Sequence, residues 1–349
     1  TNYTKSEYRS GTQNWDIDQD KNGNVYFANQ NGLLQFDGLS WRVYRIPNSL
    51  NVRAVKVDDS SGRIYVSGYN EFGYFKSDIN GQLIYTSLTN LIPDLNSDLS
   101  GFIWKIHICN GEVIFQSFLK AFILKKNKIT VLEAPKRFQF SFIVNNTLYF
   151  QDIENGILEY KNGHLTPLKG TTILNNAEVW GMFSMPEHKL LIATLEKGLF
   201  IYESGKITSW DSEANRFIKK NGSLGGASIK NNMFVLNSVL DGIIISNSNG
   251  KIVQQINLKK GLQNNTVLKS FIDDKNDLWL GLDNGIAFIN ENSPFTYFDS
   301  SYNLSTVYAS VVHNGYLYAA TNQGVFYHKL NSSFLDNNFT LVKGSTAQS

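Results

Sequence analysis

The sequence predicts an all-β protein, a β-propeller of four-stranded blades. Two observations lead to this fold: a short apolar strand pattern recurs in eight copies, and hairpin turns rich in Gly, Asn and Asp separate the copies. No long stretch shows the apolar period of about 3.6 residues that a helix needs, so helix should be scarce. With positions 17 and 310 taken as equivalent, the repeat is about 42 residues long, which is typical of propeller blades.

The recurring strand is the second of four in each repeat. An apolar inner strand and a polar turn come before it, a third strand usually opened by Gly follows, and an outer strand such as residues 41–45, 129–133 or 295–299 ends the repeat. One such sheet cannot bury both faces, whereas sheets packed around an axis bury all of them. The copies of the second strand are VYFA (25–28), IYVS (64–67), VIFQ (113–116), LYFQ (148–151), LLIA (190–193), MFVL (233–236), LWLG (278–281) and LYAA (317–320).

The two ends of the chain indicate how the ring closes. The stretch YRSGTQN from Tyr8 resembles VKGSTAQS from Val342. We therefore expect residues 3–8 to form an outer strand in the blade that contains residues 324–328, because open sheet edges favour aggregation. Residues 1–349 would then be a single propeller, the N-terminal part of a longer protein. The alternative is a seven-bladed ring in which the eighth repeat begins a second domain.

Composition excludes several classes of partner. The net charge is +2 with 18% charged residues, and no basic run is long enough to indicate nucleic acid. No segment reaches the roughly 18 apolar residues of a membrane helix. The single cysteine excludes an internal disulfide, and the five histidines fall in five repeats without the spacing of a metal site. We expect no cofactor and no metal.

The stretch DQDKNG from Asp18 copies the first half of a calcium loop, but Asn29 stands where the loop would end in Glu. A hairpin turn is the preferred interpretation, here and at the similar DDKND from Asp273. No nucleophile motif is present, and the inner strands show no acidic pair of the kind that glycosidases use. We therefore predict a protein that is not an enzyme.

One column of residues near the start of the inner strands mixes aromatic and cationic side chains where core columns hold Val, Ile and Leu. In a propeller these positions should surround one mouth of the central channel, where aromatic faces stack on sugar rings and cations donate hydrogen bonds. The alternative is that the tryptophans simply plug the channel and pack between blades. The column reads Trp15, Arg53, Trp104, Gln139, Trp180, Gly225, Lys269 and Tyr308, and we predict ligand binding by Trp15, Arg53, Trp104, Trp180, Lys269 and Tyr308.

The repeat in residues 14–44, NWDIDQDKNGNVYFANQNGLLQFDGLSWRVY, resembles the regulator-propeller repeat of bacterial membrane-spanning sensors, and DKNDLWLGLDNGIAFIN from Asp274 resembles it too. The family includes hybrid two-component sensors and related transcriptional regulators. The resemblance implies a periplasmic sensing region of an inner-membrane protein, commonly with two propellers and a β-sandwich, and many such sensors respond to glycan fragments. It marks structural residues and implies no ligand residues.

Three functions follow as hypotheses. The leading one is a periplasmic, ligand-sensing propeller that takes part in signal transduction and transcription regulation, with an oligosaccharide or other small ligand. A carbohydrate-processing propeller enzyme and a protein-interaction scaffold are the alternatives. Downstream domains of the same chain and a second copy in a homodimer are the expected protein partners.

Overall fold

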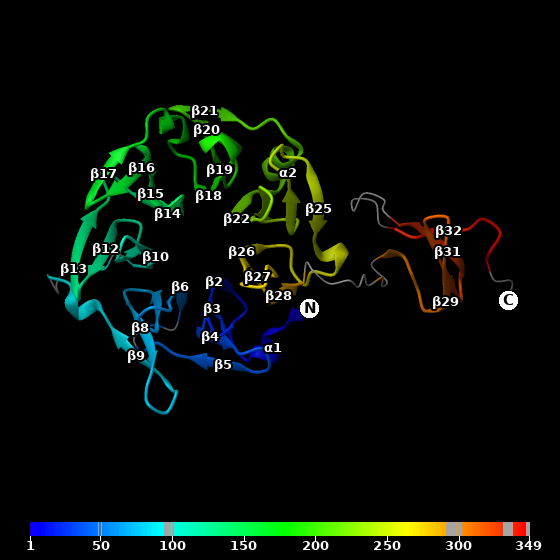
Figure 1. Cartoon of the computed structure of the whole chain (residues 1–349), viewed down its shortest axis with the longest axis horizontal. Helices are drawn as coiled ribbons and strands as arrows, with labels where there is room; N and C mark the ends of the chain where they lie inside the picture. The colour runs from blue at the N-terminus through cyan, green and yellow to red at the C-terminus, as the bar shows by residue number, and fades with distance from the viewer. Residues whose placement is uncertain are drawn as a thin grey trace.

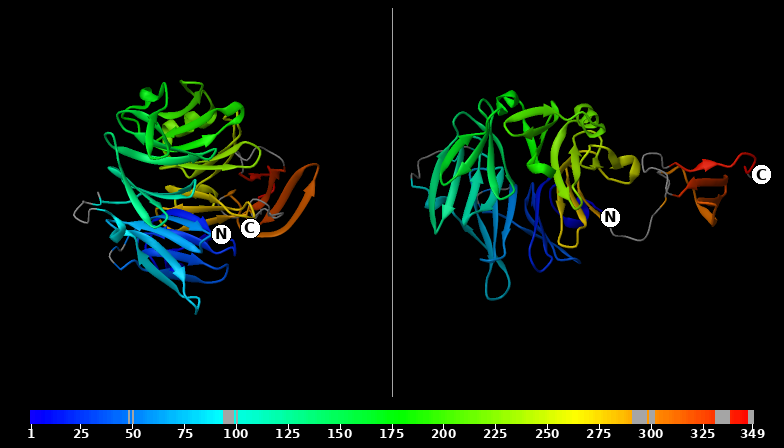
Figure 2. Two further views of the ribbon diagram at one scale, coloured as in Figure 1. Left: turned by 60° about the vertical axis from the view of Figure 1, so that its left-hand side comes forward. Right: turned by 45° about the horizontal axis from the view of Figure 1, so that its top comes forward.

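The structure is a computed structural model that describes residues 1–47, 49, 51–93, 99, 101–290, 298, 302–330 and 338–346. The predicted all-β propeller is confirmed: the described residues form antiparallel four-stranded sheets, and helix makes up only 8%. Seven sheets surround a central axis, and an eighth lies beside the ring (Figures 1 and 2). Within the described part of the chain, no helix has the length and apolar character needed to cross a membrane.

Each sheet of the ring has its inner strand first in the chain and its outer strand last, except that the seventh sheet takes its outer strand from the N-terminus. The sheets are, in order, β2 (Asn14–Gln19), β3 (Val25–Asn29), β4 (Gly32–Phe36) and β5 (Trp41–Tyr44); β6 (Val52–Asp58), β7 (Arg63–Gly68), β8 (Phe72–Ser77) and β9 (Leu83–Ser87); β10 (Lys105–Cys109), β11 (Glu112–Gln116), β12 (Lys120–Lys125) and β13 (Lys128–Glu133); β14 (Phe138–Val144), β15 (Thr147–Asp152), β16 (Gly156–Lys161) and β17 (His164–Pro167); β18 (Val179–Ser184), β19 (Leu190–Thr194), β20 (Gly198–Glu203) and β21 (Lys206–Ser209); β22 (Ser223–Ile229), β23 (Met233–Ser238), β24 (Ile243–Ser246) and β25 (Ile252–Ile256); and β26 (Val267–Ile272), β27 (Leu278–Leu282), β28 (Ile286–Ile289) and β1 (Asn2–Tyr3).

The remaining elements are the eighth sheet and a few short helices. They are β29 (Val307–His313), β30 (Tyr316–Thr321), β31 (Gly324–Lys329) and β32 (Thr340–Leu341), the helices α1 (Lys5–Tyr8) and α2 (Glu213–Asn221), and the 3-10 turns η1 (Thr89–Leu91), η2 (Thr171–Leu174), η3 (Pro186–His188) and η4 (Leu258–Lys260).

The ring has seven blades because its inner strands form a closed cycle. Each inner strand contacts the inner strand of the next sheet, and β26 contacts β2 directly, which leaves no place for β29 between them. The seven-bladed alternative therefore describes residues 1–290, and the eighth repeat stands outside this ring. The outer strand predicted at residues 295–299 lies outside the described residues, apart from position 298.

The predicted closure against residues 324–328 is wrong. Strand β1 pairs antiparallel with β28, with Asn2 opposite Ala287 and Tyr3 opposite Ile286. Residues 5–8, predicted as strand, form α1 instead. The physical reason is that the neighbour of the first blade in a seven-membered ring is the seventh blade, so the strand that precedes β2 reaches the seventh sheet. The N-terminal ammonium of Thr1 adds a hydrogen bond of 2.7 Å to the Phe288 carbonyl.

An apolar layer fills every space between adjacent blades. Seven buried clusters lie one at each blade junction, from the layer between the first and second blades to the layer that joins the seventh to the first. In the closing layer, the Tyr3 ring stacks on Trp279 at 6.1 Å and meets Trp41 at 5.3 Å. Trp210 belongs to the layer between the fifth and sixth blades. The tryptophans of the outer strands therefore serve packing between blades.

The calcium-like stretch is a hairpin turn between β2 and β3. One carboxylate oxygen of Asp20 accepts the backbone N–H groups of Asn22 and Asn24, and the other accepts the Tyr26 hydroxyl. Asp273 repeats the arrangement before β27, where its second oxygen accepts the indole N–H of Trp279. The aspartates thus replace missing backbone partners in tight turns.

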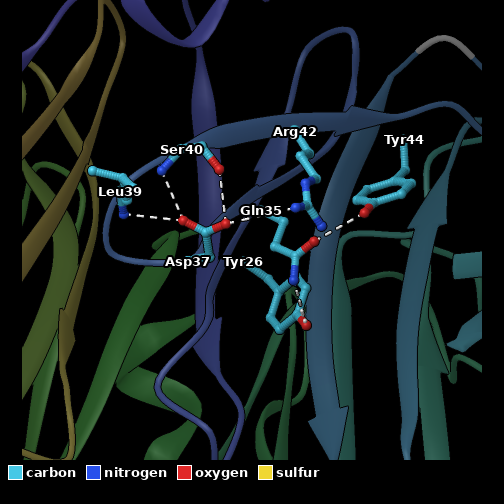
Figure 3. Close-up of polar contacts among 7 residues, drawn as sticks. All are labelled: Tyr26, Gln35, Asp37, Leu39, Ser40, Arg42 and Tyr44. Carbon is cyan, nitrogen blue, oxygen red and sulfur yellow. Dashed lines mark hydrogen bonds and ion pairs between the residues drawn. The ribbon is translucent and has the colours of Figure 1, made fainter. Parts of the chain in front are cut away.

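A third Asp turn joins β4 to β5 (Figure 3). One oxygen of Asp37 accepts the N–H groups of Leu39 and Ser40, and the Ser40 hydroxyl donates to the other oxygen at 2.7 Å. These hydrogen bonds lower the pKa of Asp37 to about 2, and the bond from the Ser40 N–H has the largest effect.

Gly32, which opens β4, has a φ of 141°, and a Cβ there would lie 2.5 Å from the Tyr44 carbonyl oxygen. Glycine lets the outer strand approach this closely.

Figure 3 also shows how polar side chains cross the three outer strands of the first blade. The Tyr44 hydroxyl donates to the side-chain oxygen of Gln35 at 2.9 Å, and the amide of Gln35 donates to the Tyr26 hydroxyl at 3.3 Å.

Helix α2 was not expected from the sequence. Ser212 caps it by accepting the N–H of Asn215, and Ile218 buries its inner face in the layer between the fifth and sixth blades.

We predict that Tyr3→Ala destabilises the ring, because the change removes the aromatic side chain that seals the last junction. We expect a loss of about 2 kcal/mol in the free energy of unfolding. Denaturant unfolding measures it, with Tyr308→Ala as the matched control, since Tyr308 is 72% exposed in the eighth sheet. Equal effects of the two changes would contradict the closure through β1.

Candidate functional site

Most inner strands carry a β-bulge near their start. The pairing with the second strand shifts between Asn14 and Asp16, between Val52 and Ala54, between Val179 and Gly181, and between Val267 and Lys269. A bulge inserts one extra residue and re-aims its side chain. The extra residues Trp15, Arg53, Trp180 and Leu268 all line a cavity on the axis of the ring.

The axial cavity has a volume of about 440 Å³ and is lined by residues from all seven blades. This volume is within the range of sites for small ligands, which lies at about 300–1,000 Å³. Its walls are the inner strands of the blades, and the bulge residues are among the side chains that line it.

Five of the six predicted ligand residues line the cavity: Trp15, Arg53, Trp104, Trp180 and Lys269. Whether they bind a ligand stays a prediction. The sixth, Tyr308, does not join them, because it belongs to β29 of the eighth sheet. The tryptophans are partly exposed, and Trp104 and Trp180 also pack against the apolar layer between the fourth and fifth blades, so the packing alternative stays open beside ligand binding.

The predicted column slips by one residue in the seventh blade. Strand pairing makes Leu268 the equivalent of Trp15, so Lys269 is equivalent to Asp16. In the sixth blade the same reasoning keeps Gly225 at the position of Trp15, because Gly226 pairs with Leu236 as Asp16 pairs with Ala28. Turn lengths differ between blades, so counting residues from a turn does not fix the phase of a strand, whereas the pairing register does.

Aromatic rings form a continuous arc along one side of the cavity. Trp15 meets Trp104 edge-on at 5.7 Å, Trp104 lies 6.2 Å from Phe140, and Phe140 meets Trp180 at 4.8 Å. The arc spans four blades, and each ring pair contributes roughly 0.5–1.5 kcal/mol beyond the area it buries. Phe140, which the sequence analysis missed, lies one residue after Gln139, which is buried and is not part of the cavity wall.

Arg53 projects into this arc from the second blade. Its guanidinium lies 4.5 Å from the centre of Trp15, 4.8 Å from Phe102 and 5.4 Å from Trp104. Burial lowers the pKa of Arg53 to about 10, so the side chain keeps its charge at neutral pH. Its Nε and Nη1 atoms are buried without a hydrogen-bond partner.

Two ion pairs cross the cavity wall between neighbouring blades. Lys269 Nζ lies 2.7 Å from Asp16, and Lys56 Nζ lies 2.8 Å from Asp18. The same two carboxylates accept the backbone N–H groups of Val55 and Val57 on β6. Side chains thus provide the polar contacts between inner strands, which belong to different sheets. Burial alone would raise the pKa of Asp16, but the neighbouring cations and hydrogen bonds hold it below its usual value.

The two carboxylates correct one sequence expectation. Asp16 and Asp18 are an acidic pair on one inner strand, and both line the cavity. Their Cα atoms are roughly 6–7 Å apart, as expected for residues two apart on one strand. A glycosidase needs one of its two carboxyls protonated as an acid. The lowered pKa of Asp16 and the ion pair at each carboxylate do not favour that role.

Lys105 and His107 line the part of the cavity wall that the third blade contributes. Burial, and then the charge of Lys269, lower the pKa of Lys105 to about 8, and its ammonium lies 4.7 Å from the Phe140 ring. Burial, and then the charge of Lys105, lower the pKa of His107 to about 3. His107 is therefore neutral at pH 7, and its Nε2 lies 2.9 Å from the Ser141 hydroxyl.

Solved structures with the same fold include two sensor regions. The extracellular domain of a putative hybrid two-component system from B. thetaiotaomicron matches with a TM-score of 0.69 and 17% identity, over 95% of this chain and 47% of that one. The extracellular domain of a putative one-component system from the same organism matches with a TM-score of 0.66 and 17% identity, over 97% of this chain and 47% of that one. The chain thus spans about half the length of these neighbours.

Enzymes share the fold too. Virginiamycin B lyase from Staphylococcus aureus matches with a TM-score of 0.61 and 15% identity, over 82% of this chain and 96% of the lyase. At these identities the likeness establishes the propeller fold alone. No family model and no curated protein matches the chain. The sensor regions are nevertheless of the class that the sequence repeat resembles.

We predict that His107 makes the protein sensitive to acid. The folded state keeps His107 neutral down to a pKa of about 3, whereas an unfolded histidine has a pKa of about 6.5. The unfolded state therefore binds more protons between these values, and stability falls as pH falls through this window. His107→Gln, which retains a donor for Ser141, should reduce the loss of stability between pH 7 and pH 4 by about 1–3 kcal/mol.

Thermal unfolding across this pH range measures the effect. The control is His164→Gln, at an exposed position in β17. If His107→Gln and His164→Gln lose stability with the same pH dependence, the burial of a neutral His107 is not the cause.

Proposed function

We propose that this chain is the ligand-sensing propeller of a bacterial signalling protein that acts outside the cytoplasm. The ligand is a small molecule, with a glycan fragment as the leading class, and it occupies the axial cavity. The protein would be periplasmic, part of an inner-membrane regulator that controls transcription through domains beyond this chain.

The observation that carries the proposal is the aromatic arc beside a cavity of about 440 Å³. Sugar rings present apolar faces that stack on indole and phenyl rings, while their hydroxyls need donors and acceptors. The arc supplies the aromatic faces, and Arg53 and Lys105 supply hydrogen-bond donors for the hydroxyls. The shared fold with extracellular domains of putative signalling systems supports the cellular role.

A carbohydrate-processing enzyme is the second candidate. It is favoured by the acidic pair Asp16 and Asp18 in the cavity and by the lyases that share the fold. Against it stand the ion pair at each carboxylate and the neutral state of His107, whose ring nitrogen is already bonded to Ser141. Turnover of an oligosaccharide by the purified protein would favour the enzyme over the sensor.

We predict that Trp180→Ala weakens ligand binding by roughly 1–3 kcal/mol, the loss expected for a stacking anchor. Trp180 is partly exposed at the end of the arc, so the fold should survive the change. Calorimetric titration with a panel of oligosaccharides measures the affinity, and circular dichroism checks the fold.

Tyr308→Ala is the matched control for this experiment. Tyr308 has the same place in its repeat as Trp180 but lies in β29, away from the cavity. Its replacement should leave the affinity unchanged. A loss of binding in Tyr308→Ala with wild-type affinity in Trp180→Ala would move the ligand site to the eighth sheet.

A further inference from the structure

Arg53 lies in the cavity without a counter-charge. Two other cations of the cavity wall form ion pairs. Lys269 pairs with Asp16, and Lys56 pairs with Asp18. Across the residues that the structure describes, the Arg53 side chain has neither an ion pair nor a hydrogen bond, and burial is the one cause that shifts its pKa. A buried charge is unfavourable unless a partner compensates it.

Arg63, on the next strand of the same blade, shows what a structural arginine looks like here. Its guanidinium also lies on an aromatic ring, 4.4 Å from the centre of Tyr74. Its Nε is buried without a partner, as in Arg53, but its Nη1 donates a hydrogen bond to the Tyr65 hydroxyl and the side chain interacts with the charge of Asp58. Arg63 is not part of the cavity wall. Stacking on rings therefore does not explain why Arg53 has no polar partner.

The whole cavity carries an excess of positive charge. Four cationic side chains and two carboxylates line it, so two positive charges are uncompensated while His107 is neutral. Among the described cations of the wall, Arg53 and Lys105, from adjacent blades, have no ion pair, although Lys105 still interacts with the charge of Asp16 that Lys269 pairs with. The indole N–H of Trp15, beside Arg53, is a further buried donor without an acceptor. Donors without a partner and cations without an ion pair together favour an acceptor that carries negative charge.

We propose that the aromatic end of the axial cavity is an anion site, in which Arg53 pairs with a carboxylate, sulfate or phosphate group of a sugar whose ring lies against Trp15 and Trp104. This proposal rests on the proposed function, because it takes the axial cavity to be the ligand site, and it narrows the ligand from glycans in general to acidic ones. A planar guanidinium binds such groups through two parallel hydrogen bonds, which also fixes the orientation of the attached ring.

Lys105 is the second cation of the site, and it makes the site sensitive to pH. The groups that face it are Asp16, Lys269 and His107, together with the Phe140 ring. With a pKa of about 8, Lys105 is mostly protonated at pH 7 and mostly neutral at pH 9. Arg53 stays charged over this range, so affinity for the anion should fall with rising pH through loss of the Lys105 charge alone.

The test is a titration of the whole chain with matched acidic and neutral sugars at low ionic strength. The pairs are trigalacturonate with its methyl ester, and glucose 6-sulfate and glucose 6-phosphate with glucose. The tryptophan fluorescence of the arc and the shift in melting temperature report binding. The three acidic probes distinguish a uronate, a sulfate ester and a phosphate as the source of the charge.

We expect at least one acidic sugar to bind about ten-fold or more tightly than its neutral counterpart, the factor that one charge-assisted pair supplies. Arg53→Met should reduce this preference to within about two-fold, and Arg63→Met, the matched control, should retain it. Lys105→Met should remove the decline in affinity between pH 7 and pH 9. Without ligand, Arg53→Met should melt at or above the wild-type temperature, since it removes an unpaired buried charge.

Two results overturn the anion site: no acidic sugar binds more tightly than its neutral counterpart, or the preference persists in Arg53→Met. A neutral sugar that binds without any preference for charge, and that Trp180→Ala weakens, overturns the anion site but leaves the proposed sensing function in place. If neither acidic nor neutral sugars change the fluorescence or the melting temperature, both proposals are wrong.

Discussion

The structure depends on the apolar layer between one blade and the next. Each blade is a thin sheet with two apolar faces, so it is stable only when both neighbours are present. Seven such layers follow one another around the axis, and the seventh exists only because residues from opposite ends of the ring meet in it. There Tyr3 and Tyr8 from the N-terminus pack with Trp279 of the last blade and Trp41 of the first. Without this junction, two apolar faces and two sheet edges would be left open to solvent.

The same packing creates the cavity. The layers hold the blades apart at the axis, where inner strands of different sheets face one another. Side chains fill part of the gap, as the bonds from Asp16 and Asp18 to the backbone of β6 show. The bulges then place one extra residue from each of several blades in the wall of the cavity. A wall made of seven repeats can therefore hold different side chains at equivalent positions, such as Trp15, Arg53 and Leu268, and its chemistry varies while the fold stays constant.

The charges of this wall divide into two groups. One group holds the blades together, because the pairs Lys269–Asp16 and Lys56–Asp18 join the first blade to its two neighbours. The other group, Arg53 and Lys105, lies next to the aromatic arc and has no carboxylate of its own within the described ranges. In the proposed anion site, this asymmetry would give the cavity its preference for an acidic ligand.

The sequence by itself determined the repeat and the local structure: the strand pattern, the Asp turns and the glycine at Gly32 depend on residues close together in the chain, so their signals survive in a single sequence. It also predicted that Trp15, Arg53, Trp104 and Trp180 line one cavity, because equivalent positions of a repeat occupy equivalent places around an axis. Only the tertiary structure decided the number of blades, since closure depends on Tyr3 meeting Ile286, two segments far apart in the chain whose backbone pairing leaves no mark in their side chains. It likewise decided that Leu268 rather than Lys269 holds the bulge position and that Tyr308 lies outside the cavity, because pairing register and ring membership arise from contacts between strands.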